Sequence, residues 1–143
     1  MLQTKEDLKT KIMSVLGTPT MGSFATISNG KPWVRYVMIH TKDTLDMYFT
    51  TSKQSRKVAQ LKENPNCHIT AGGNPTDFTK PYLQIEGKAE ILEDLAIKKE
   101  FWNDYLANMF QGPEDPNYVI VHIKPETIEY WSMGQMKPEI YKA

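Results

Sequence analysis

The sequence has one cysteine, no long apolar run and no excess of one charge. Cys67 stands alone among 143 residues, so neither a disulfide framework nor a thiolate cluster for zinc or iron–sulfur is expected. No stretch approaches the roughly 18 apolar residues of a membrane span, and the segment MLQTKEDLKTKIM lacks the uninterrupted apolar core of a signal peptide. These features predict a cytoplasmic protein with no membrane association.

The charges of the chain balance. There are 17 Lys and Arg residues and 17 Asp and Glu residues, so the formal net charge is zero. Such a chain carries no global field that would attract nucleic acid or an anionic membrane, and any anion site must be local. The length suits about one domain with a substantial core. No repeat or linker is visible, so a single domain over residues 1–143 is expected.

Short β-type runs and turn signals dominate the chain. Leu8, Ile12 and Leu16 lie at helical spacing and predict a first helix that ends before Gly17. Asn29-Gly30 separates two β-rich runs and predicts a hairpin, because both residues tolerate a positive φ. Further predicted strands span residues 45–51, 67–71, 82–92, 118–123 and 127–131, with a turn at 41–44 and a bulge or bend at Gly87. A second helix is predicted to end at Asn64-Pro65, and a third to run from Asp94 to about Met109.

Seven strand candidates with mostly hairpin-length links, and only three helices, favour a mainly β fold. A doubly wound parallel sheet would need helices between most strands. The expected architecture is therefore an antiparallel sheet closed into a barrel, with about three helices packed outside it.

The segment TTSKQSRKV, residues 50–58, places Lys53, Arg56 and Lys57 at a predicted helix start, with no acid nearer than Glu63. Cations are disfavoured at the positive end of a helix dipole. Hydroxyls in the same segment add hydrogen-bonding groups: Thr50, Thr51, Ser52 and Ser55. Together with the free first-turn N–H groups they suit a phosphate. The alternative is a solvated helix end whose long cations extend into water, and the segment alone leaves both open.

Arg35 favours the phosphate. Alternation along WVRYVMI puts Trp33, Arg35, Val37 and Ile39 on one strand face. A charge beside large apolar groups is costly unless it is paired or held at the rim of a barrel. The turn at 41–44 brings the next strand back beside this one, so Arg35 and the basic segment are expected to face one anion.

The remaining polar residues give weaker signals. His40, His68 and His122 lie on three different predicted strands without metal-ligand spacing, so no metal site is expected. No nucleophile elbow is present, and no catalytic acid or base can be named. Asp43 and Asp46 are interpreted as turn and surface charges.

Four segments in order carry a family resemblance: Trp-Val-Arg-Tyr-Val in a hairpin, a strand ending in Thr-Thr, Ser-Arg-Lys at a helix start, and Ile-Glu-Tyr-Trp near the end. The chain resembles the FMN-binding split-barrel family related to pyridoxamine 5'-phosphate oxidase, and is most similar to its short general stress protein branch. The resemblance covers nearly the whole chain. It implies an antiparallel, Greek-key-like split β-barrel that forms a homodimer with two FMN sites at its interface.

The resemblance also implies site residues. Arg35, Arg56 and Lys57 match the residues that hold the FMN phosphate, and Lys53, Thr50, Thr51, Ser52 and Ser55 are expected to assist them. The strand beside the isoalloxazine ring contributes Arg35, Tyr36, Val37, Met38 and His40. Tyr82 falls at the position of a flavin-contacting Gln, with Gln84 two residues later on the same face. Trp131 matches an aromatic residue usually supplied across the dimer interface.

Two departures from the family pattern bear on activity. Residues 101–117 and 135–143 contain no Arg, whereas the vitamin oxidases use Arg residues there for the substrate phosphate. His40 also replaces an expected Lys. These departures leave the FMN-binding residues in place, so the resemblance still implies FMN binding, but pyridoxamine 5'-phosphate oxidation is not expected. The main hypothesis is an FMN-dependent oxidoreductase that exchanges hydride or electrons with a nicotinamide or a small organic molecule. The alternatives are a non-catalytic flavin-binding or flavin-storing stress protein, and the same fold binding a deazaflavin or haem.

Overall fold

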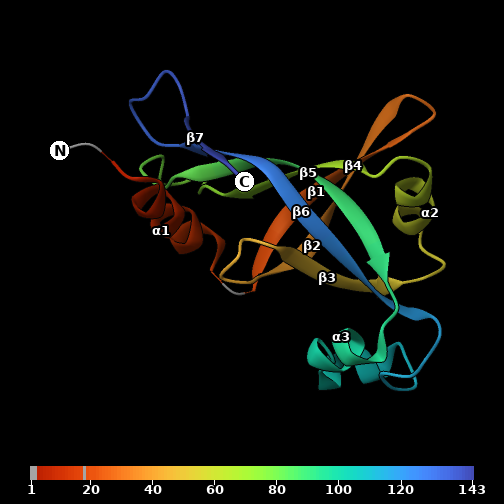
Figure 1. Ribbon diagram of the computed structural model, residues 1–143. Helices are drawn as coiled ribbons and strands as arrows, with labels where there is room; N and C mark the ends of the chain where they lie inside the picture. Colours follow the sequence, from red (N-terminus) through yellow and green to blue (C-terminus); the bar gives the residue numbers. More distant parts are fainter. Residues whose placement is uncertain (1–2, 18) are drawn as a thin grey trace.

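The computed structural model describes residues 3–17 and 19–143. The elements, in chain order, are α1 (Lys5–Leu16), β1 (Thr20–Ser28), β2 (Lys31–Thr41), β3 (Met47–Ser52), α2 (Arg56–Glu63), β4 (Asn66–Gly72), β5 (Tyr82–Leu92), α3 (Leu95–Glu100), the 3-10 helix η1 (Asp104–Asn108), β6 (Tyr118–Trp131) and β7 (Glu139–Lys142). The expectation of a mainly β fold with peripheral helices is confirmed (Figure 1).

Six strands close into an antiparallel barrel. The sheet order is β3-β2-β1-β4-β5-β6-β7, and an additional pairing between β3 and β6 joins the two sides. β7 pairs with the outer half of β6 and does not take part in the closure. Full closure leaves few unpaired strand edges. An edge that stays unpaired in such a barrel offers backbone hydrogen-bonding groups to a ligand.

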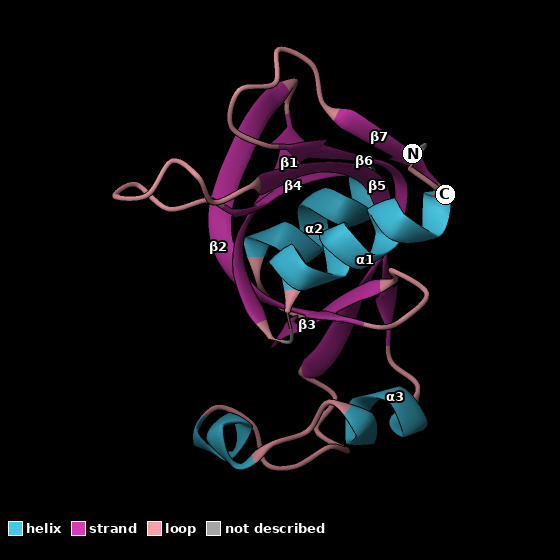
Figure 2. Cartoon of the chain, turned by 90° about the vertical axis from the view of Figure 1, so that its left-hand side faces the viewer, coloured by secondary structure: helices cyan, strands magenta, loops and turns pink. Residues whose placement is uncertain are grey.

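The barrel interior is filled by the inward side of each strand, with a helix at either end. Phe24 and Phe49 meet edge to face in this core, with their ring centroids 5.0 Å apart. Ile12 and Leu16 of α1 and Leu61 of α2 belong to the same buried cluster. Figure 1 shows α1 and α2 at opposite ends of the barrel, and in Figure 2 both helices lie within the ring of strands. The two helices therefore seal the core.

The turn chemistry followed the sequence closely. Asn29 and Gly30 have φ values of 52° and 73°, and β1 and β2 form a hairpin that pairs from Ser28 with Lys31, next to the turn, to Thr20 with Ile39. Gly87 lies at a register shift between β5 and β6, as the predicted bulge requires. The next strand begins at Met47 and not at Leu45, because Leu45 has a φ of 73° and still belongs to the turn.

Two boundary predictions were wrong. The predicted helix from Asp94 to Met109 is broken into α3 and η1, because the Asn103 side chain accepts the N–H of Tyr105 at 3.0 Å and starts a new turn. The two predicted closing strands are one strand, β6, that continues through Pro125. Pro125 is tolerated because β3 pairs with β6 only as far as Ile123, and β7 pairs from Thr127 onward. The short strand β7 was not predicted.

Across residues 3–17 and 19–143, no helix combines the length and the apolar character needed to cross a lipid bilayer.

Candidate functional site

The barrel opens between β2 and β3. In the part of the chain that the structure describes, these strands pair only at His40 with Tyr48 and at Thr41 with Met47. Beyond that point β2 follows β1 and β3 follows β6, so the two strands separate. Backbone N–H and C=O groups along the facing edges are then available to a ligand. A pocket of about 440 Å³ lies at this opening.

The pocket has two walls and a basic end. Its lining residues are Tyr36, Val37, Met38, His40, Phe49, Thr50, Lys57, Asn103, Tyr105, Leu106 and Met109. β2 and β3 supply one wall, and the segment around η1 supplies the other, packed outside the barrel (Figure 2). The pocket therefore combines apolar and polar side chains, with a cation from the first turn of α2 at one side.

The structure brings together the predicted residues Tyr36, Val37, Met38 and His40 along β2. Strand alternation turns Val37 into the core and leaves Tyr36 and Met38 on the outer surface, 78% and 44% exposed. The His40 ring lies 5.6 Å from the ring of Phe101. Its partial burial lowers the pKa of His40, so near neutral pH this imidazole is uncharged.

Arg35 reaches the same end of the molecule from the inward face of β2. Its Nη1 donates to Thr26 Oγ1 at 2.8 Å and its Nη2 donates to Gln60 Oε1 at 2.9 Å. Longer bonds join Nη1 to the carbonyl oxygens of Phe24 and Trp33, each at 3.3 Å. Every one of these acceptors is neutral. Arg35 is thus fixed in place without losing its charge to an acid.

Arg56 and Lys57 begin α2 beside it. The Arg56 guanidinium lies over the Trp33 ring, 5.4 Å from the ring centroid, a cation–π contact that leaves the charge free. Lys57 Nζ donates to Thr51 Oγ1 at 3.1 Å. The first turn of α2 holds no acidic residue, and the side chain of the N-cap residue Ser55 caps no backbone N–H.

Arg35, Arg56 and Lys57, here called the cation group, repel one another. Burial and the nearby Arg56 lower the pKa of Arg35. Burial and Arg35 likewise lower the pKa of Lys57. Among residues 3–17 and 19–143, no ion pair joins any of the three to a carboxylate. The group is an unneutralised positive centre next to the pocket.

The four hydroxyl residues of segment 50–58 differ in position: three lie near the basic end of the pocket, and one supports the turn into α2. Thr50 lines the pocket, while Thr51 lies on the inward face, where its hydroxyl donates to Ser55 Oγ at 3.4 Å. Ser52 Oγ accepts the N–H of Gln54 at 3.2 Å and so supports the turn into α2. Thr50, Thr51 and Ser55 therefore lie closest to the basic end of the pocket, and Ser52 shapes the loop.

Lys53 is not gathered with the cation group. Its Nζ forms an ion pair with Glu93 at 2.9 Å, and both side chains are more than 40% exposed. Glu93 lies forty residues further along the chain, just after β5. The sequence offered no local signal for this partner.

Tyr82, Gln84 and Trp131 lie on the outer face of β5 and β6. Tyr82 pairs with Trp131 across the strands, and the two rings stack at 6.1 Å between centroids and 4° between planes. Gln84 pairs with Glu129, whose carboxylate accepts the Trp131 indole N–H at 3.1 Å. The three predicted residues form one patch, but none of them lines the pocket of their own chain.

Sequence reasoning missed the second wall of the pocket and the side chains that fix Arg35. Asn103, Tyr105 and Met109 were predicted to belong to a packing helix, yet they line the pocket. Asn103 did carry a usable signal, because Asn is a preferred N-cap residue. Gln60 lies one helical turn after Arg56, but nothing in the sequence marked it as a partner of Arg35.

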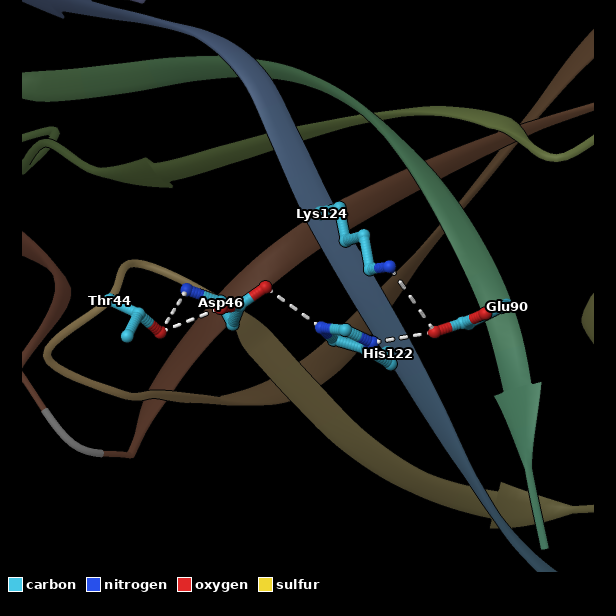
Figure 3. Close-up of polar contacts among 5 residues, drawn as sticks. All are labelled: Thr44, Asp46, Glu90, His122 and Lys124. Atoms are coloured by element: carbon cyan, nitrogen blue, oxygen red, sulfur yellow. Dashed lines mark hydrogen bonds and ion pairs between the residues drawn. The ribbon is translucent and has the colours of Figure 1, made fainter. Parts of the chain in front are cut away.

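A second polar cluster lies on the outer side of β6 (Figure 3). His122, only 8% exposed, has Asp46 Oδ1 at 2.9 Å from Nε2 and Glu90 Oε1 at 2.9 Å from Nδ1. The ring therefore bridges two carboxylates that come from the turn before β3 and from β5. Asp46 is therefore more than the surface charge that the sequence suggested.

This cluster is connected to the elements around the pocket. The His122 ring stacks on Tyr48 at 4.6 Å, and Tyr48 stacks on Phe101 at 5.0 Å. Burial tends to raise the pKa of Asp46, but hydrogen bonds from Thr44 and His122 bring it below its ordinary value. The cluster ties the turn before β3 to β5 and β6, and supports the surface on which α3 packs.

These features define a split-barrel protein: six antiparallel strands form a closed barrel that separates between β2 and β3. The chain matches the family described as Pyridoxamine 5'-phosphate oxidase over residues 8–132, and it belongs to that family. It is 37% identical to General stress protein 26 of Bacillus subtilis over 134 residues, which cover 94% of this chain and 95% of that protein. The expected resemblance to the general stress protein branch is confirmed.

Solved structures agree with the assignment. General Stress Protein 26 from Bacillus anthracis is 35% identical, with a TM-score of 0.81 over 95% of this chain and 98% of that chain. A pyridoxine/pyridoxamine 5'-phosphate oxidase of Yersinia pestis is 35% identical over 95 residues, but they span 66% of this chain and only 42% of the oxidase. The fold also occurs in a fad-binding protein from Mesorhizobium loti (17% identical, TM-score 0.65, 83% of this chain and 88% of that chain) and a heme binding protein from Mycobacterium smegmatis (13% identical, TM-score 0.76, 99% and 59%).

Proposed function

We propose that the pocket between β2 and β3 binds FMN, with the phosphate held by the cation group. The observation that carries the proposal is the cation group itself. Three cations converge at the uncapped start of α2 and have no acidic partner among the described residues. A phosphate supplies the missing negative charge, and the free first-turn N–H groups and the Thr51 and Ser55 hydroxyls supply hydrogen bonds.

The rest of the pocket suits an isoalloxazine ring. The unpaired edges of β2 and β3 offer backbone donors and acceptors to the polar rim of a flat ring. Val37, Phe49, Leu106 and Met109 offer apolar contacts. Thr50 and Lys57 lie where the pocket meets the basic end. The residues present therefore suit the ring of FMN as well as its phosphate.

The proposed activity is that of an oxidoreductase working with a nicotinamide or a small organic molecule. The flavin, when bound, supplies hydride transfer. The protein's part is to bind and orient the ring, and the wall built by η1 covers one side of the pocket. His40, neutral because burial lowers its pKa, is a hydrogen-bonding group beside the ring and not a second cation.

We also propose that the site is completed by a second copy of the chain. Met21, Val34, Tyr36 and Met38 form an exposed apolar face on β1 and β2, and such a face on a sheet is typical of an interface. Tyr36 and Met38 belong both to this face and to the pocket lining. Trp131 does not line the pocket of its own chain. In a two-fold dimer, Trp131 of each chain would instead lie at the pocket of the other chain.

The flavin-binding and haem-binding neighbours define two competing ligands for the same site. The cation group accepts either the phosphate of a flavin or the propionates of haem. A deazaflavin with a phosphate tail has the same requirements as FMN. Both walls of the pocket carry apolar side chains, Val37 on β2 and Leu106 on η1 among them, and the cation group suits a phosphate. These two features together favour FMN.

The test is to purify the protein, record its absorption spectrum, and identify the released ligand by mass. FMN, or uptake of added FMN by colourless protein, supports the proposal, whereas haem or no uptake of FMN refutes it. Anaerobic mixing with NADH or NADPH then separates two roles. Bleaching of the flavin within turnover times supports a reductase, and unchanged colour supports a flavin-binding stress protein without turnover.

A further inference from the structure

All the side chains and carbonyl groups that accept hydrogen bonds from Arg35 are neutral. A carboxylate in their place would form a stronger, charge-assisted bond with the guanidinium. Two donors converge on one oxygen of Gln60: the Thr26 hydroxyl at 2.6 Å and Arg35 Nη2 at 2.9 Å. Thr26 is 1% exposed, and its own Oγ1 accepts from Arg35 Nη1 at 2.8 Å. The three side chains form a closed triangle of hydrogen bonds at the end of the barrel.

We infer that Gln60 is a positioning residue, which holds Arg35 in place through a neutral oxygen so that its charge stays available to a bound anion. This inference rests on the proposed phosphate site but concerns a residue that does not touch the phosphate. Gln60 acts through Arg35, and Thr26 fixes the amide oxygen from the other side.

The argument depends on what a carboxylate would do at this position. A glutamate in place of Gln60 would have the same size and could keep both hydrogen bonds, because both donors point at the oxygen and not at the amide nitrogen. Its bond to Arg35 would become charge-assisted and stronger. Elsewhere in the chain lysines do have such partners, as in Lys42 with Glu100 and Lys53 with Glu93. The neutral amide of Gln60 leaves the repulsion within the cation group unrelieved.

The partial burial of Arg35 and Lys57 makes this difference large. Arg35 and Lys57 are shielded enough that burial is the largest cause of their lowered pKa values. Charges in such surroundings are screened less than surface charges. A carboxylate in place of the Gln60 amide would therefore both neutralise Arg35 and repel an incoming phosphate.

The experiment uses the full-length chain with Gln60→Glu, and Gln135→Glu as the matched control. Gln135 lies in the exposed loop before β7, on the other side of the molecule from α2 (Figure 1). Gln60→Glu is expected to raise the melting temperature of the apoprotein and to weaken FMN binding by roughly tenfold or more. Riboflavin, which lacks the phosphate, is expected to bind within about twofold of wild type because it makes no charged contact of this kind. Gln135→Glu is expected to change neither affinity.

A second variant separates charge from structure. Gln60→Met keeps the length of the side chain but removes the acceptor, so it is expected to lower the melting temperature and to weaken FMN binding through misplacement of Arg35. The salt dependence of FMN binding should fall in Gln60→Glu, where one cation is neutralised, and persist in Gln60→Met. A purely structural role for Gln60 would leave both salt dependences alike, and that result would overturn the inference.

A flavin-free measurement keeps this inference distinct from the proposed function. Inorganic phosphate is titrated into the apoproteins and the melting temperature is followed. Phosphate is expected to stabilise wild type and Gln135→Glu, and to have little effect on Gln60→Glu. Equal stabilisation of all three refutes the role of Gln60, whatever FMN does. If phosphate behaves as expected but wild type binds FMN no better than riboflavin, the anion site stands and the FMN assignment fails.

Discussion

Lys57→Met is the most direct perturbation of the proposed phosphate site. Met preserves much of the length and apolar stem of Lys, so the packing at the start of α2 is kept while one charge is lost. The structure shows no acid beside Lys57 within the described residues, and burial together with Arg35 lowers its pKa. Removing the charge should therefore leave the apoprotein no less stable, despite the lost bond to Thr51.

Lys57→Met should weaken FMN binding strongly, but it should not weaken the binding of riboflavin, which lacks the phosphate. A charged hydrogen bond contributes about 1.5–3 kcal/mol, which corresponds to roughly 10- to 150-fold in affinity. Fluorescence titration of the apoprotein with FMN and with riboflavin measures both dissociation constants. The control is Lys53→Met, because Lys53 lies in the same segment but is paired with Glu93 at 2.9 Å. We expect FMN affinity to fall only in Lys57→Met, and riboflavin affinity to fall in neither.

The pH dependence gives a second signature of the same side chain. The charged ammonium is the form that binds phosphate, and its pKa is lowered in the folded apoprotein. FMN affinity in wild type should therefore fall as the pH rises through that lowered pKa, and this component should be missing in Lys57→Met. Equal losses of FMN and riboflavin affinity, or equal effects of Lys53→Met and Lys57→Met, would refute a phosphate site at the cation group.

Three further predictions test other parts of the structure. In a shared dimeric site, Trp131→Ala and Lys57→Met subunits that each bind FMN weakly should regain one normal site when mixed, whereas sites built within one chain would regain none. Asp46→Asn should lower the free energy of unfolding near neutral pH by about 1–2 kcal/mol, and the deficit should shrink in acid because the Asp46 pKa is lowered in the fold; the turn control Asp43→Asn should show no such trend. Gly87→Ala, whose Cβ would lie 2.6 Å from the Lys124 carbonyl oxygen, should cost about 1–3 kcal/mol in chemical denaturation, and an unchanged midpoint would contradict the close packing at the bulge.

The parts of the fold that were predictable rest on short-range physics. Asn29-Gly30 specifies its hairpin because both residues take a positive φ at little cost. Alternation along β2 put Arg35 on the inward face beside Val37, as found. The broken third helix shows the limit, since Phe101 and Tyr105 have helical spacing while the Asn103 side chain restarts the chain between them. The spacing of apolar residues indicates which side chains are buried. It does not indicate whether the backbone hydrogen bonds of a helix continue without a break.

The parts of the site that were not predictable depend on contacts between distant segments. Glu93 withdraws Lys53 from the cation group, and no local pattern links residues forty positions apart. Gln60 is a polar residue on a short amphipathic helix, where a solvated side chain is the usual expectation. Its role becomes visible only when β1 and β2 bring Thr26 and Arg35 to the same end of the barrel.

The three members of the cation group share one kind of contact. Each member has a partner that fixes its position but does not neutralise it: Gln60 for Arg35, the Trp33 ring for Arg56, and the Thr51 hydroxyl for Lys57. Such contacts satisfy hydrogen-bonding groups and apolar stems while the mutual repulsion remains. In the free protein that repulsion lowers stability, and a bound dianion turns it into attraction. These three contacts leave the electrostatic strain at this end of the barrel in place, and the phosphate site proposed above would draw its preference for an anion over a neutral ligand of the same shape from that strain.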